Sequence, residues 1–123
     1  MESSGPVRWS VEFYADLAGR CDVLEFISSL PVQEQATIKR SLELLQEFGL
    51  QLPTTYAKAI TSHRKLWELS VGGIRLFYVA HEGRTFVVRH GFRKKSMKTP
   101  VRDIMVAGRR MAEFLSREGG DGP

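Results

Sequence analysis

Cysteine is nearly absent from this sequence of 123 residues, and Cys21 is the only one. A single thiol cannot close a disulfide within the chain or supply a Cys-rich zinc site, and it is typical of a reducing compartment. The three histidines, His63, His81 and His90, are far apart in the sequence, with no paired carboxylates at helical spacing near them. We therefore expect neither a bound metal nor another cofactor.

Long apolar runs are also missing. Charged residues interrupt every apolar stretch before it reaches the roughly 20 residues that span a membrane, and the acidic N-terminus lacks the apolar segment of a secretory signal. We expect a soluble, cytoplasmic protein with no membrane partner. The composition, 42% hydrophobic and 26% charged, is typical of globular proteins. The length fits one domain over residues 1–123, with an ordered core at about residues 7–116.

Basic residues are abundant, but only in one part of the chain. Residues 1–56 carry four basic and eight acidic side chains, a net charge of −4, whereas residues 57–123 carry 14 and six, a net charge of +8. Six bases and no acid lie between positions 84 and 98: Arg84, Arg89, Arg93, Lys94, Lys95 and Lys98. Such a run favours a polyanionic partner, with phosphate as the first choice. The alternative is a solvated basic surface.

The hydrophobic pattern predicts an α+β domain in the order β-α-α-β-β-β-α. Alternation over residues 7–14 predicts a strand, and helical spacing predicts two helices, over residues 22–30 and 31–48. Residues 50–63 show no clear period and are predicted as a loop. Strands over residues 65–71, 74–79 and 85–90 follow, then a helix that starts with Thr99 as its cap. The two helices should form a hairpin packed on one face of a small antiparallel sheet.

Gly72-Gly73 is a strong hairpin signal, because glycine tolerates the positive φ of a two-residue turn. A turn of this length pairs Val71 with Ile74. It also places Arg75 opposite Ser70 and near Glu68, on a sheet face that we expect no helix to cover. One apolar face should hold Trp67, Leu69, Val71, Ile74, Leu76 and Tyr78.

The register of the third strand is open. A two-residue second turn places Phe86, Val88 and His90 beside Arg75, whereas a three-residue turn places Val87 and Arg89 there. Alternation favours Phe86 and Val88 in the core and therefore Arg89 on the polar face.

The basic residues suit chemistry at a phosphate. Fixed positive charges can stabilise the extra charge of a phosphorane, and RNA carries its own nucleophile, the 2′-hydroxyl. A lysine among like charges, or His90, could move the protons, and Phe77 or Phe92 could stack on a base.

Two stretches resemble the RelE/HigB superfamily of bacterial toxins, and within it the phage-derived HigB-like branch. They are L-W-E-L-x5-R-L-F-Y at residues 66–78 and H-G-F-x-K-K-x-x-K-T-P at residues 90–100. The resemblance runs in the right order from Trp9 to about Leu115.

The resemblance implies a RelE-like fold and the toxin of a type II toxin–antitoxin system. Such a toxin is a metal-independent endoribonuclease that cuts mRNA in the A site of the 70S ribosome and leaves a 2′,3′-cyclic phosphate and a 5′-hydroxyl. It also implies a cognate helix-turn-helix antitoxin as partner, with operator DNA contacted only through that antitoxin. A non-catalytic RNA- or ribosome-binding module and an inactive homologue are the alternatives.

Candidate site residues follow from the resemblance and from the basic run. Arg75 matches the family's arginine in the central strand, and Arg93, Lys94 and Lys95 match its second cationic cluster. The tyrosine that some relatives carry beyond this cluster has no counterpart in residues 97–100. The predicted catalytic residues are Arg75, Lys94, Lys95 and His90. The predicted RNA-binding residues are Arg64, Lys65, Phe77, Arg89, Phe92, Arg93 and Lys98.

Overall fold

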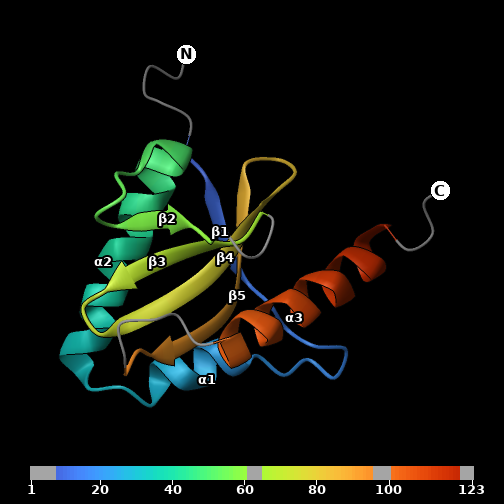
Figure 1. The fold of residues 1–123 in the computed structure, drawn as a ribbon, viewed down its shortest axis with the longest axis horizontal. Coiled ribbons are helices and arrows are strands. Elements are labelled where there is room, and N and C mark those ends of the chain that lie inside the picture. The colour runs from blue at the N-terminus through green and yellow to red at the C-terminus, as the bar shows by residue number, and fades with distance from the viewer. Residues whose placement is uncertain (1–7, 61–64, 96–100, 120–123) are drawn as a thin grey trace.

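A five-stranded sheet lies between two layers of helix (Figure 1) in the computed structural model, which describes residues 8–60, 65–95 and 101–119. The elements are β1 (Ser10–Phe13), α1 (Asp22–Ser28), α2 (Val32–Phe48), a 3₁₀ turn (Gly49–Gln51), β2 (Ala57–Ala59), β3 (Trp67–Val71), β4 (Ile74–His81), β5 (Thr85–Arg93) and α3 (Val101–Gly119). Across the sheet the strand order is β1-β5-β4-β3-β2. The predicted α+β class and RelE-like fold are confirmed, but the predicted order β-α-α-β-β-β-α lacks one strand, β2.

The two edge strands differ from the sequence prediction. β2 lies in the segment predicted as a loop and pairs antiparallel with β3 through residues 57–59. Three residues are too few to show a period, which explains why the pattern missed this strand. β1 pairs parallel with β5, with Ser10 opposite Thr85. No hairpin joins β1 to its neighbour, so a tight turn does not impose an antiparallel direction, and the sheet is mixed.

The central hairpin has the predicted register. Val71 lies opposite Ile74 and Ser70 opposite Arg75, and Gly72 adopts the left-handed conformation, with φ +58, that the turn requires. The predicted apolar face is therefore confirmed.

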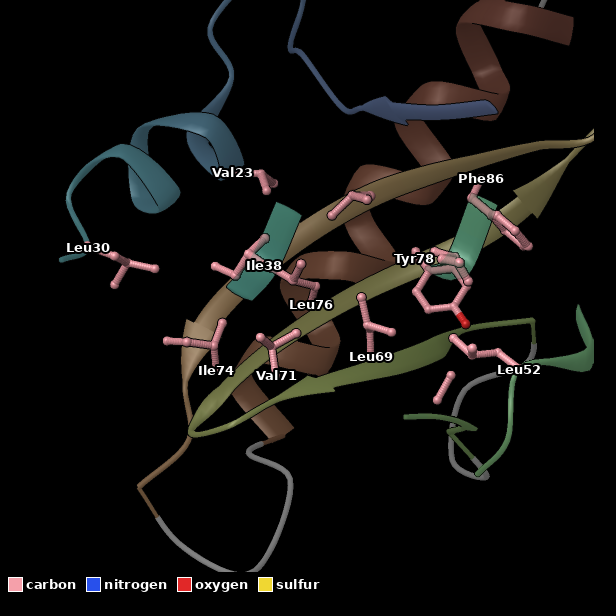
Figure 2. Close-up of a cluster of buried hydrophobic side chains, with 13 residues drawn as sticks. Val23, Leu30, Ile38, Leu52, Leu69, Val71, Ile74, Leu76, Tyr78 and Phe86 are labelled. Carbon is pink, nitrogen blue, oxygen red and sulfur yellow. The ribbon is translucent and has the colours of Figure 1, made fainter. Parts of the chain in front are cut away.

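That apolar face packs against α1 and α2 (Figure 2). Val23 of α1 and Ile38 and Leu45 of α2 are buried there. Trp9 stacks on Phe86, with the ring centroids 4.3 Å apart. The buried members of this cluster are Val23, Leu30, Ile38, Leu45, Leu52, Ala57, Leu69, Val71, Ile74, Leu76, Tyr78, Phe86 and Val88.

The opposite face is covered by α3, so the expectation that no helix covers it is wrong. Ala107, Met111 and Phe114 lie on one side of α3, at spacings of four and three residues, and pack on the sheet. Leu115 is exposed, because Phe114 occupies the inner position. The buried members of this second cluster are Tyr14, Ile60, Leu66, Phe77, Val79, Val87, Phe92 and Ala107. The predicted cap, Thr99, lies outside the described residues.

A β-bulge in β5 decides which side chains face α3. The turn between β4 and β5 has three residues, because His81 pairs with Thr85. Further along, Phe77 pairs with His90 but Tyr78 pairs with Val88, which leaves Arg89 as an extra residue. Phe86 and Val88 face α1 and α2, as predicted. The extra residue lets both Arg89 and His90 contact α3.

Candidate functional site

Arg75 lies at the start of β4, directly after the turn between β3 and β4. Its Nη1 donates hydrogen bonds to the carbonyl oxygens of Gly72, at 2.6 Å, and Ile74, at 2.9 Å. Its Nε lies 3.3 Å from a carboxylate oxygen of Glu68, and the side chain is 18% exposed. These contacts fix the guanidinium while part of the side chain stays at the surface, an arrangement that suits an anion such as phosphate.

Glu68 of β3 is the residue that holds Arg75. Its side chain is 0% exposed, and neither carboxylate oxygen accepts a hydrogen bond in the part of the chain that the structure describes. Besides Arg75, the Nζ of Lys58 on β2 lies 3.9 Å from this carboxylate. Burying a carboxylate is costly unless a cation accompanies it. Glu68 is therefore tied to Arg75 by its own need for a counter-charge.

Lys94 and Lys95 follow β5 at the same end of the sheet. The backbone N–H of Lys94 donates to the carbonyl oxygen of Gly73, at 2.8 Å, which places this segment beside the turn that precedes Arg75. The side chain of Lys94 is half-buried and that of Lys95 is exposed. We refer to Arg75, Lys94 and Lys95 together as the basic corner.

Arg93 points to the other face of the sheet. It pairs with Ile74, whose side chain lies in the cluster under α1 and α2. Its two terminal nitrogens donate to the two carboxylate oxygens of Glu34 on α2, at 3.0 and 2.6 Å. These hydrogen bonds raise the pKa of Arg93 and lower that of Glu34. The ion pair with Glu34 thus holds Arg93 against α2, on the opposite face of the sheet from Arg75.

His90 is held between β5 and α3. Its Nε2 lies 2.6 Å from a carboxylate oxygen of Asp103, and its Nδ1 lies 3.4 Å from Nη1 of Arg110. A guanidinium only donates, so we assign Nδ1 as the acceptor and place the proton on Nε2. Burial lowers the pKa of this imidazole, although Asp103 acts in the opposite direction. Both ring nitrogens therefore have a neighbour on α3, and the side chain is 16% exposed.

Three more predicted RNA-binding residues lie beneath α3 instead of on an open surface. Phe77 and Phe92 are buried, with their ring centroids 5.1 Å apart, and Arg89 is 0% exposed. Neither phenyl ring is accessible for stacking on a base. Burial, rather than any change in register, removes these side chains from the surface, because α3 covers the face that the sequence suggested was open.

The remaining predicted residues lie apart from the basic corner. Lys65 precedes β3 and is exposed, roughly 17 Å along the strand from the level of Arg75 if each residue advances about 3.3 Å. Arg64 and Lys98 lie outside the described residues. No group of three or more His, Cys, Asp or Glu side chains that could hold a metal is found within residues 8–60, 65–95 and 101–119. No helix among these residues is long and apolar enough to cross a membrane.

Comparison with known proteins assigns the family. The family model described as phage-derived protein Gp49-like matches residues 25–112, which is more than half of the chain. The chain belongs to this Gp49-like family, a RelE/HigB-like toxin family. A comparison with curated proteins finds no match.

The Gp49-like chain also resembles a solved structure. It superposes on a chain of the crystal structure of the archaeal RelE–RelB complex from Pyrococcus horikoshii OT3 with a TM-score of 0.57. The match covers 71% of this chain and 96% of that chain at 12% sequence identity, so it concerns the fold. Family and fold together indicate a toxin of toxin–antitoxin type, and the family resemblance predicted from the sequence is confirmed.

Sequence reasoning missed several residues that hold the candidate side chains of this Gp49-like protein in place. Lys58 lies in the segment predicted as a loop. Asp103 and Arg110, which hold His90, are seven residues apart and so lie on one side of α3. Their spacing and the strand over residues 85–90 were visible in the sequence, but the packing of the helix on that strand was not.

Proposed function

We propose that this protein is a metal-independent endoribonuclease that cleaves mRNA in the ribosomal A site with the RNA 2′-hydroxyl as nucleophile. The observation that supports the proposal is the basic corner, in which the segment of Lys94 and Lys95 lies beside the turn that precedes Arg75, through the hydrogen bond from the N–H of Lys94 to the carbonyl oxygen of Gly73. Arg75 is held in place by a buried carboxylate. In a toxin-family fold, such a fixed cation is suited to a phosphate whose negative charge increases during the reaction.

The proposed reaction is an internal transesterification. The 2′-oxygen forms a bond to phosphorus, the bond from phosphorus to the 5′-oxygen breaks, and the products are a 2′,3′-cyclic phosphate and a 5′-hydroxyl. One proton leaves the 2′-hydroxyl and one is delivered to the departing 5′-oxygen. Arg75 would stabilise the phosphorane, and Lys94 and Lys95 would accept and deliver the protons. His90 has no proton-transfer role in this scheme, because its two nitrogens are engaged.

The partners in this proposal are those of a type II toxin. They are mRNA on the 70S ribosome, in the cytoplasm, and a cognate helix-turn-helix antitoxin through which operator DNA is contacted. The similarity to a RelE chain that was crystallised with RelB supports an antitoxin partner.

The direct test is to map the 5′ ends of cellular transcripts after brief induction of the wild type and of Lys95→Ala. We expect new 5′-hydroxyl ends within translated frames with the wild type and their loss with Lys95→Ala. Lys39→Ala is the matched control, because Lys39 is also an exposed lysine but lies on α2. New ends that persist unchanged in Lys95→Ala would remove Lys95 from the mechanism.

A non-catalytic RNA- or ribosome-binding module is the second candidate, and the engagement of both nitrogens of His90 favours it. It predicts growth arrest without new ends. If the protein only binds, Lys95→Arg should leave growth arrest unchanged, because only the positive charge matters. If Lys95 transfers protons, the same change should lower cleavage, since arginine stays protonated.

A further inference from the structure

Arg89 is a buried cation that uses little of its hydrogen-bonding capacity within the described residues. Its Nη1 donates to the carbonyl oxygen of Arg110, at 3.2 Å, and its guanidinium lies 4.5 Å from the ring centroid of Phe114. Nε and Nη2 are buried and have no hydrogen-bond partner in the described part of the chain. An unpaired buried charge of this kind carries a large desolvation cost.

The two unpaired nitrogens share one edge of the guanidinium. This edge, formed by Nε and Nη2, is the one that binds two oxygens of a carboxylate or phosphate side by side. The carboxylate of Glu113 acts on Arg89 electrostatically, but it accepts hydrogen bonds from Tyr14 and Arg117, each at 2.7 Å. The free edge of Arg89 is therefore suited to an anion from outside the described residues.

A cavity of about 250 Å³ lies beside Arg89, between β4 and the C-terminal half of α3. Lys65 and Glu82, both exposed, and His81 line it from the sheet side, and Met111 and Leu115 line it from the helix. Its volume is below the lower end of small-molecule pockets, at about 300 Å³, and suits a group the size of phosphate. Lys65 and Arg89 supply two positive charges against the single negative charge of Glu82.

We propose that this cavity is a second anion site, in which the free edge of Arg89 binds two oxygens of a phosphate group and Lys65 neutralises that group at the entrance. The phosphate comes from an RNA backbone or from free phosphate. The RNA source rests on the proposed function, but the site itself does not.

The position of the cavity favours the RNA source. Arg89 is three residues along β5 from Phe92, the pairing partner of Arg75, which is about 10 Å along the strand. Both arginines approach the same face of the sheet, within the part of the chain that carries a net charge of +8. One RNA strand that passes the basic corner can therefore reach both.

Entry to the site requires a side chain to move, because the guanidinium of Arg89 is 0% exposed. Met111 lines the cavity and has the flexible, unbranched side chain that adapts most readily. Its methyl group is therefore a direct reporter of occupancy.

The test is a titration of the full chain, labelled with ¹³C in its methionine methyl groups, with inorganic phosphate at constant ionic strength. The sequence has four methionines. We expect a saturable shift of the Met111 signal and no shift of Met105, which lies on α3 but is 56% exposed and outside the cavity lining. No response of Met111, or an equal response of both signals, overturns the proposal.

Two variants connect the response to the site. Lys65→Gln, at an exposed position, should weaken phosphate binding about three- to fivefold, the effect of losing one exposed charge pair. Lys39→Gln, an exposed lysine on the other layer, should leave binding unchanged. Arg89→Lys, with folding checked by circular dichroism, should abolish the Met111 response. Equal binding by the two lysine variants contradicts the proposal even if Arg89→Lys fails to fold.

Three further titrations identify the source and the class of anion. A 2′-O-methyl trinucleotide, which cannot be cleaved, should move the Met111 signal at lower concentration than inorganic phosphate if the RNA backbone is the source. A response to inorganic phosphate alone supports a site for free phosphate. An equal response to acetate would overturn the phosphate assignment in favour of a carboxylate from a protein partner. None of these readouts needs cleavage, so the site and the nuclease proposal can fail separately.

Discussion

The two faces of the sheet differ in what they bury. Under α1 and α2 the buried cluster is apolar, from Val23 on α1 to Phe86 on β5. The opposite face of the sheet also buries two charged side chains, Glu68 and Arg89, and holds the His90–Asp103 pair at the boundary. Burying charge costs stability. The face under α1 and α2 can thus supply most of the stability. The opposite face carries buried polar groups that lower stability, which indicates that their positions serve function.

This difference indicates where the molecule is specialised. Proteins break the rules of core composition mainly at functional sites and offset the cost elsewhere. Here the buried charge of Glu68 holds Arg75, and the basic corner lies on the same side. The contrast between the faces can be tested by substitutions on each.

The largest effect on stability is expected on the apolar face. Phe86→Ala removes a fully buried ring that stacks on Trp9 and should lower the free energy of unfolding by about 3–5 kcal/mol. Denaturant unfolding measures this loss. Val32→Ala, at an exposed apolar position, is the control and should change it by less than about 0.5 kcal/mol. Phe86→Ala should leave cleavage per folded molecule unchanged. A loss of cleavage in the folded variant would contradict the assignment of function to the opposite face of the sheet.

A smaller loss of stability, now coupled to function, is expected at Glu68. Glu68→Ala leaves Arg75 and Lys58 without their shared counter-charge and should cost about 3 kcal/mol in the free energy of unfolding. The nearly isosteric Glu68→Gln should cost less but should still lower cleavage, because Arg75 loses its anchor.

Glu34→Gln is the matched control for Glu68→Gln, since Glu34 also pairs with an arginine but on the other face. Equal cleavage by the two variants, measured at the same folded concentration, would show that Glu68 does not position Arg75.

The smallest effect is a pH dependence from His90. Burial lowers the pKa of this group below its ordinary 6.5, against the opposing carboxylates of Asp103 and Asp22 and with the support of Arg110. The unfolded chain therefore takes up a proton as the pH falls through about 6.5, whereas the folded chain takes it up only at a lower pH. The contribution of neutral His90 to the free energy of unfolding is therefore complete above about pH 6.5 and is lost progressively as the pH falls.

His90→Gln should consequently lower the free energy of unfolding more at about pH 7.5 than at about pH 5.5. Unfolding curves of wild type and variant at both pH values measure this. A larger loss at the lower pH would mean that His90 is held in its charged form by Asp103.

Much of the apolar face could be predicted from sequence. Gly72-Gly73 imposes a two-residue turn, and this turn sets the pairing of Val71 with Ile74 and the position of Arg75. The alternation of Phe86 and Val88 then places β5 correctly against the helices. These features depend on local patterns, and local patterns are visible in one sequence.

The other face depends on contacts between distant segments. The bulge at Arg89 breaks the alternation of β5. An unbroken alternation from Phe86 and Val88 would assign His90 to the face under α1 and α2, whereas His90 contacts α3. The position of α3 is set by packing of Ala107 and Phe114 on residues far earlier in the chain. The hydrophobic period of α3 shows that the helix has an apolar side, but it does not show which strands that side contacts. Phe77 and Phe92 were therefore expected at an open surface, which α3 covers.

The central claim is that Arg75, and not merely basic charge, makes the cleavage site. The most direct test compares single-turnover cleavage of ribosome-bound mRNA by purified wild type, Arg75→Ala and Arg93→Ala. We predict products with 2′,3′-cyclic phosphate ends, a rate about 10²–10³-fold lower for Arg75→Ala, and a rate within about twofold of wild type for Arg93→Ala. Equal losses in the two variants, or no cleavage by the wild type, would contradict the account.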